Sequence, residues 1–137
     1  MRNRKRMLIV MLAAMMFSVS AFSIGAEAAS KTFFSNKPCQ GFYCTATGSI
    51  GDSSCSANFS ATAMPGTTVM PGESYSSAIF IANFDTNNTL RGTHFYYGTT
   101  NCSGSVIAVD YYMGHIECEF RFQNTTVTNR TYTLTNN

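Results

Sequence analysis

Strict alternation of apolar and polar residues is the feature that most limits the fold of this chain. It is clearest in residues 55–63, where every second residue is Cys, Ala or Phe and the residues between are Ser, Asn or Thr. Residues 116–123 alternate in the same way. A period of two residues is typical of β-strands with one buried face. Apolar residues at helical spacing do not extend over three turns anywhere in residues 29–137, so the sequence predicts an all-β fold.

Turn signals separate several further short strands. Prolyl-glycine pairs at residues 65–66 and 71–72 and the run Asp-Thr-Asn-Asn at 85–88 are typical of β-turns, because they supply the φ angles that turns need. Short strands divided by turns at regular intervals are typical of sandwiches and small barrels. We expect a small antiparallel β-sandwich of about seven strands, the others being residues 42–47, 76–84, 90–97 and 106–113 and a last strand near Tyr132 and Leu134.

A β-hairpin is expected to join residues 106–113 to residues 116–123 through Gly114 and His115. Glycine at the first position of a two-residue loop suits a type II′ turn, whose twist matches that of the flanking strands. The turn also sets the register of the two strands. A slip of one residue would turn the glutamates of residues 116–123 into the core, so the turn and the burial pattern predict the same pairing.

In this register the two faces of the hairpin differ. Tyr111 would lie opposite Cys118 on an inner face made of apolar pairs. Asp110 would lie opposite Glu119 on the outer face, where like charges cost up to about 1 kcal/mol unless they are relieved. The outer face is therefore either a solvated surface relieved by Arg121, or a site for a cation or a basic partner.

The first residues have the pattern of an export signal. Four basic residues in positions 2–6 precede an apolar run, and Ala26-Glu27-Ala28 supplies a cleavage site. We expect residues 1–28 to be a signal peptide, with a short Met- and Ala-rich composition that looks bacterial, and residues 29–137 to form a single secreted domain. The apolar run of the leader is too short and too rich in serine for a retained membrane anchor, and no membrane span is expected in the mature chain.

The charge of the mature chain gives little support to nucleic acid as a partner. Four of the nine basic residues and one of the seven acidic residues lie in the leader, which leaves five basic against six acidic residues. The five are scattered along the chain rather than gathered in a stripe of the kind that contacts phosphates. No nucleic-acid partner is expected.

Five cysteines lie in the mature part, where export permits disulfide bonds. Cys55 and Cys118 both alternate onto inner faces, which favours a bridge across the core. Bridges between Cys44 and Cys55 or between Cys39 and Cys44 are the alternatives. Because five is odd, one thiol is left over, and a disulfide-linked homodimer is one consequence. No C-x-x-C pair or histidine at ligand spacing occurs, so no metal and no cofactor are expected.

Two short segments resemble known families of secreted proteins. The run VMPGESY, at residues 69–75, resembles a strand-turn-strand passage of immunoglobulin-like modules, and Cys55 and Cys118, 63 residues apart, resemble their inter-sheet bridge. No tryptophan lies between them, and residue 116 is Ile where such domains place a tyrosine. The run FYYGTTNCSGSVI, at residues 95–107, is similar to small crystallin-like inhibitors. Both resemblances imply a β-sandwich.

Exposed tyrosines are expected beside the charged residues of the hairpin. Alternation turns about half of the rings in residues 94–97 and 110–112 outward, and rigid amphipathic rings on a sheet suit protein or glycan recognition. Ordinary cross-strand pairing on a surface is the alternative. The candidate binding residues are Tyr97, Asp110, Tyr112, Glu117, Glu119 and Arg121.

The sequence favours a non-enzymatic role. Neighbouring carboxylates on a flat strand face lack the concave site that separates the pKa values of an acid and a base, and no G-x-S-x-G motif occurs. We therefore expect a secreted, extracellular binding module of the surface, adhesion or inhibitor type, with an extracellular protein or glycan as its partner. A secreted toxin or bacteriocin-like antimicrobial protein is the alternative.

Overall fold

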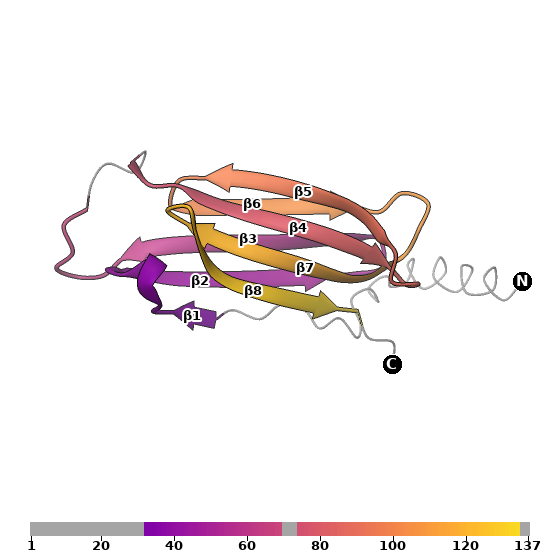
Figure 1. Ribbon diagram of the computed structural model, residues 1–137, viewed down its shortest axis with the longest axis horizontal. Coiled ribbons are helices and arrows are strands. Elements are labelled where there is room, and N and C mark those ends of the chain that lie inside the picture. The colour runs from indigo at the N-terminus through magenta and orange to yellow at the C-terminus, as the bar shows by residue number, and fades with distance from the viewer. Residues whose placement is uncertain (1–31, 70–73, 135–137) are drawn as a thin grey trace, which may run out of the picture.

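The computed structural model describes residues 32–69 and 74–134, which form two antiparallel four-stranded sheets packed face to face (Figure 1). The expected all-β sandwich is thereby confirmed. The first sheet has the order β1-β2-β3-β6, with β1 Thr32–Phe34, β2 Phe42–Ile50, β3 Ser54–Ala63 and β6 Asn101–Ile107. The second sheet has the order β5-β4-β7-β8, with β4 Ser77–Asp85, β5 Leu90–Gly98, β7 Met113–Phe122 and β8 Thr125–Thr133.

Outside the strands, one short 3-10 helix, η2 (Lys37–Cys39), connects β1 to β2. None of the described residues forms a helix long and apolar enough to cross a membrane. The signal peptide expected at residues 1–28 and most of the second prolyl-glycine turn, at residues 71–72, lie outside the described residues.

The pairing of the two central strands, β3 and β7, is also found in immunoglobulin-type sandwiches, although the edge strands differ. In those folds strand B pairs with A and E, while strand F of the opposite sheet pairs with C and G. Here β3 pairs with β2 and β6, and β7 pairs with β4 and β8.

Three tight turns can be recognised from their hydrogen bonds and backbone angles. Thr67 N–H donates to the Met64 carbonyl oxygen, and Gly66 has a φ of +86°, so the first prolyl-glycine turn is present as expected. Asn88 N–H donates to the Asp85 carbonyl oxygen, which closes the expected turn between β4 and β5. The turn at residues 123–124 was not anticipated: both residues have φ near +60°, which is the geometry of a two-residue type I′ hairpin.

The prediction of a hairpin turn at Gly114 and His115 is wrong. Both residues lie inside β7, which runs unbroken from Met113 to Phe122 and pairs with β4 and β8. Gly114 is required for a different reason, because a Cβ there would lie 2.5 Å from the carbonyl oxygen of Asp85. The glycine marks a close approach between two strands rather than a turn.

The prediction of a strand at residues 106–113 is also wrong for most of these residues. β6 ends at Ile107, and residues 108–112 carry the chain from the first sheet to the second. Asp110 has a φ of +65°, which no extended strand can accommodate. The expected register, which turns Tyr111 inward, would also bury Ile107 and Val109 and expose Val106. The structure has the reverse, since Val106 is buried while Ile107 and Val109 are 72% and 67% exposed.

The apolar residues that alternate along β7 are buried, as the sequence predicted. Ile116, Cys118, Phe120 and Phe122 are all buried in the core between the sheets. Across the core, Phe59 of β3 packs with its ring centroid 6.4 Å from that of Phe120 and 5.9 Å from that of Phe122. Burial of each such side chain contributes about 1.5–3 kcal/mol, so this layer helps to hold the two sheets together.

A row of small residues on the inner face of the first sheet lets aromatic rings of the second sheet approach it closely. Gly48, Ala57 and Gly104 are paired across β2, β3 and β6. Tyr132 of β8 lies over Gly48 and Tyr96 of β5 lies over Gly104, so closely that a Cβ on either glycine would stand 2.2 Å from a ring carbon. The two glycines therefore provide the space that the tyrosine rings fill.

Replacing either of these glycines should destabilise the fold. We expect Gly48→Ala and Gly104→Ala each to lower the free energy of unfolding by about 1–3 kcal/mol, because the ring above must move. Urea unfolding measures the change. Gly51→Ala is the matched control, since a Cβ there comes no closer than 3.8 Å to the Ser54 carbonyl oxygen. Equal stability of all three variants would contradict the packing described.

Candidate functional site

The outer face of the second sheet brings together exposed rings and charged side chains. Alternation in β7 turns residues 117, 119 and 121 away from the core, opposite the outward residues of β4, and the outward residues of β5 continue the same rows. We call this surface the aromatic face, defined by Phe80, Phe95, Tyr97, Glu117, Glu119 and Arg121.

The rings of the aromatic face form a continuous group. Phe80 and Phe95 are directly paired across β4 and β5, with ring centroids 4.6 Å apart. Phe95 and Tyr97 lie nearly parallel on β5, with an interplanar angle of 8° and centroids 6.5 Å apart. Phe95 is 60% exposed and Tyr97 is 76% exposed. Large rings this exposed leave apolar area in water that a partner could cover.

The charged residues beside the rings are paired with one another. Arg121 Nε lies 3.2 Å from Glu119 Oε2, and the Thr126 hydroxyl donates to the same carboxylate oxygen. His115 Nε2 lies 3.5 Å from Glu117 Oε2. These polar groups lie along β7, on one side of the rings, and the charge of Glu119 is balanced by Arg121.

Four of the six residues expected to form the binding site do share this face. Tyr97 and Arg121 both pair with Ala78, one from each side, so they lie in one cross-strand row. Glu117 and Glu119 lie on the same outer side of β7. The sequence missed Phe95 and Phe80. Phe95 could have been predicted from the sequence, because it lies two residues from Tyr97 in the same strand and therefore faces the same side of the sheet.

Asp110 and Tyr112 do not belong to the aromatic face. They lie in residues 108–112, at the end of the sandwich, because the chain crosses between the sheets there. Asp110 therefore does not face Glu119, which instead pairs with Phe80 and Asn129. The predicted pairing of Asp110 with Glu119 is wrong for this reason.

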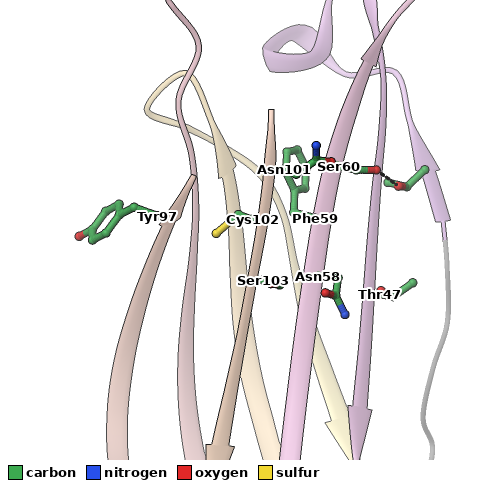
Figure 2. A pocket seen from close by; sticks show the side chains of 9 residues that line it. Thr47, Asn58, Phe59, Ser60, Tyr97, Asn101, Cys102 and Ser103 are labelled. Atoms are coloured by element: carbon green, nitrogen blue, oxygen red, sulfur yellow. Dashed lines mark hydrogen bonds between the residues drawn. The ribbon is translucent and has the colours of Figure 1, made fainter. Parts of the chain in front are cut away.

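A second feature is a shallow depression on the outer face of the first sheet. Figure 2 shows its side chains on neighbouring strands, with Tyr97 at the β5 side. Its volume is about 500 Å³. We call it the hydroxyl depression, after the outward side chains that line it: Thr45, Thr47, Asn58, Ser60, Asn101 and Ser103.

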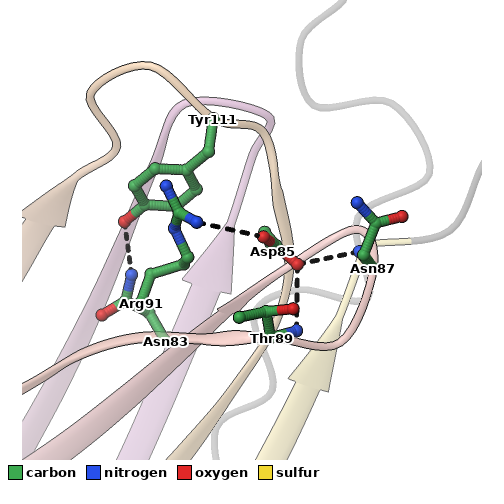
Figure 3. Close-up of polar contacts among 6 residues, drawn as sticks. All are labelled: Asn83, Asp85, Asn87, Thr89, Arg91 and Tyr111. Atoms are coloured by element: carbon green, nitrogen blue, oxygen red, sulfur yellow. Dashed lines mark hydrogen bonds and ion pairs between the residues drawn. The ribbon is translucent and has the colours of Figure 1, made fainter.

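A polar cluster holds the connection between β6 and β7 against the end of β4 (Figure 3). The Asn83 side-chain amide donates to the Tyr111 hydroxyl, and the Arg91 guanidinium lies 4.6 Å above the Tyr111 ring. Arg91 also lies 3.6 Å from Asp85. A hydrogen bond from the Thr89 N–H is the main cause that lowers the pKa of Asp85. These contacts join the turn to the crossing segment, so the cluster has a structural role.

The described cysteines form one disulfide bond, between Cys39 and Cys44. Cys55, Cys102 and Cys118 are free thiols, and each is at least 94% buried. Burial raises the pKa of Cys55 to about 11 and that of Cys118 to about 12. These three thiols are therefore protonated and shielded at neutral pH.

The expected bridge between Cys55 and Cys118 is not present in this structure. Both side chains point inward as the alternation indicated. Inward orientation alone does not produce a bond: burial is the main cause that raises the pKa of Cys118 and the nearby Cys55 adds to it, yet both thiols are free. The burial of the three free thiols also leaves none of them at the surface for a disulfide-linked homodimer.

No group of three or more His, Cys, Asp or Glu side chains is placed to hold a metal ion within residues 32–69 and 74–134. The chain matches no protein-family model, and neither curated proteins nor solved structures provide a match to it. The chemistry of the two outer faces therefore has to be interpreted from their own residues.

Alkylation tests the assignment of the cysteines. Unfolded in denaturant without a reducing agent, the protein should take up three alkyl groups per chain, at Cys55, Cys102 and Cys118. The folded protein should react far more slowly at about pH 8, because the thiols are buried and protonated. Mass spectrometry counts the groups. Uptake of a single group by the unfolded chain would mean that two of these cysteines are bridged.

Proposed function

We propose that this chain is an exported, non-enzymatic binding module that holds a partner protein on its aromatic face. The observation that carries the proposal is the pair of exposed, nearly parallel rings of Phe95 and Tyr97 beside Phe80. Aromatic side chains dominate the energetics of protein interfaces, because they bury a large area and lose little conformational entropy. The pair would act as the anchor of the interface.

The size and chemistry of the face support a protein partner. Four strands about 4.8 Å apart and nine residues rising about 3.3 Å each make a face of roughly 20 by 30 Å. This approaches the area of roughly 800 Å² that each partner of a standard protein complex contributes. Glu117, Glu119 and Arg121 lie beside the rings, as the polar rim of a protein interface does.

The same geometry supports a role without catalysis. Glu119 already accepts hydrogen bonds or charge contacts from Arg121 and Thr126, and Glu117 lies on an open sheet surface next to His115. An acid–base pair needs two environments that separate its pKa values inside a concave site. Neither carboxylate is among the residues that line the hydroxyl depression.

Site-specific photocrosslinking tests the proposal. A photoreactive phenylalanine at position 97 should give one discrete adduct with a protein in cultures of the producing cells. The same group at Tyr43, which is 45% exposed on the other sheet, is the matched control and should not give that adduct. Phe95→Ser should weaken the isolated complex about thirtyfold, which corresponds to a hot spot of about 2 kcal/mol. It should lower the free energy of unfolding by only about 1 kcal/mol, the cost of losing the cross-strand contact with Phe80.

Two outcomes would contradict this proposal or favour the alternative function. The same adduct from positions 97 and 43, or none from position 97, would contradict binding through the aromatic face. Growth inhibition of neighbouring cells by purified protein, unchanged by Phe95→Ser, would instead favour the toxin that the sequence left as an alternative.

A further inference from the structure

We propose that the hydroxyl depression of the first sheet is a second binding site, which takes a neutral, polyhydroxylated ligand, namely a segment of an uncharged glycan. This site lies on the sheet opposite the aromatic face and has different chemistry. It does not depend on the proposed protein partner.

The register of three strands builds the depression. β2, β3 and β6 are paired so that Thr45, Ser60 and Asn101 form one row. Alternation turns these side chains outward, while their neighbours along each strand, such as Ala46 and Phe59, are buried. The floor is therefore a paired sheet over a packed core, which holds the lining groups in fixed positions.

A second row lies next to the first. Thr47, Asn58 and Ser103 are paired across the same three strands and also point outward. Neighbouring strands are about 4.8 Å apart, and residues two apart along a strand are about 6.7 Å apart. The two rows thus present a small grid of hydrogen-bonding groups, in which Figure 2 labels Thr47, Asn58, Ser60, Asn101 and Ser103.

The grid contains hydroxyls and carboxamides and no charged side chain. Four of the six side chains carry a hydroxyl and two carry a carboxamide, and each of these groups both donates and accepts hydrogen bonds. Thr45 and Ser60 bond to each other at 2.9 Å. Within the described residues, the side chains of Thr47, Asn58 and Asn101 make no hydrogen bond to the protein, so their groups remain open to a ligand.

This chemistry selects one class of ligand. An anion or a cation would lose its hydration without meeting an opposite charge, which is costly. An apolar ligand would leave the lining groups unpaired, which is also costly. A neutral sugar chain offers hydroxyls that can donate and accept in turn. The depression of about 500 Å³ falls within the usual range of small-molecule sites, about 300–1,000 Å³.

Tyr97 borders this depression as well as belonging to the aromatic face. In Figure 2 its ring points away from the labelled hydroxyl and carboxamide side chains of the first sheet. The proposed contacts with a ligand are therefore those of the grid, and they do not depend on this ring.

Calorimetric titration with a panel of oligosaccharides tests the proposal. The neutral probes are hexasaccharides of glucose (β-1,4 and α-1,4 linked), xylose and N-acetylglucosamine, and the charged probes are oligogalacturonate and a heparin fragment. We expect at least one neutral probe to bind with a Kd below about 10 mM, and a tenfold rise in salt to leave its Kd within about twofold.

A pair of double variants locates the site. Thr47→Val with Asn58→Val removes two central groups of the grid and should weaken binding at least about tenfold, because two ligand hydrogen bonds are lost. Ser49→Val with Ser56→Val is the matched control, since Ser49 and Ser56 form the next row outside the depression. Phe95→Ser should leave sugar binding unchanged, which separates this site from the aromatic face.

Three results would overturn the proposal. They are the absence of binding by every neutral probe, binding only by charged probes with loss at high salt, and equal weakening by the two double variants. Circular dichroism and thermal unfolding of both double variants verify that each remains folded, and the single variant Asn58→Ser supplies a milder change in the same position if either fails to fold.

Discussion

The placement of β7 between β4 and β8 is the constraint on which the rest of this structure depends. Ile81, Cys118 and Arg130 lie in register across the three strands. Because successive residues of a strand point to opposite sides, this register decides which side chains of β7 enter the core and which face water. A slip of one residue would place Glu119 in the core instead of Phe120. Burial of an unpaired carboxylate is strongly unfavourable, so this alternative register is excluded.

Given that register, the sandwich presents two outer faces of different character. The close approach of Tyr132 to Gly48 and of Tyr96 to Gly104 sets the spacing of the sheets at both sides. The faces are therefore held on paired strands over a packed core, rather than on loops. One face carries exposed rings beside charged side chains, and the other carries an uncharged grid of hydroxyls and carboxamides. Each face suits a different class of partner.

Local pattern predicted local structure well and long-range pairing poorly. The alternation of residues 55–63 and 116–123 predicted the buried faces of β3 and β7, and the turns at 65–66 and 85–88 were predicted from their residue types. The partner of β7 was not, because Gly114 supports a turn and a close strand approach equally well in sequence. The contact of Phe80 with Phe95 depends on the register of β4 with β5, which no local pattern contains.

Backbone contacts across β7 test the account most directly. Nuclear Overhauser effects measured by NMR on the folded protein should connect Glu117 to Ala82 on one side and to Thr131 on the other, since these residues are paired in the second sheet. Such contacts would establish the register that orients the aromatic face. Contacts between Cys118 and Tyr111 in their place would mean that the chain folds back at Gly114, and the arrangement of the aromatic face described above would be wrong.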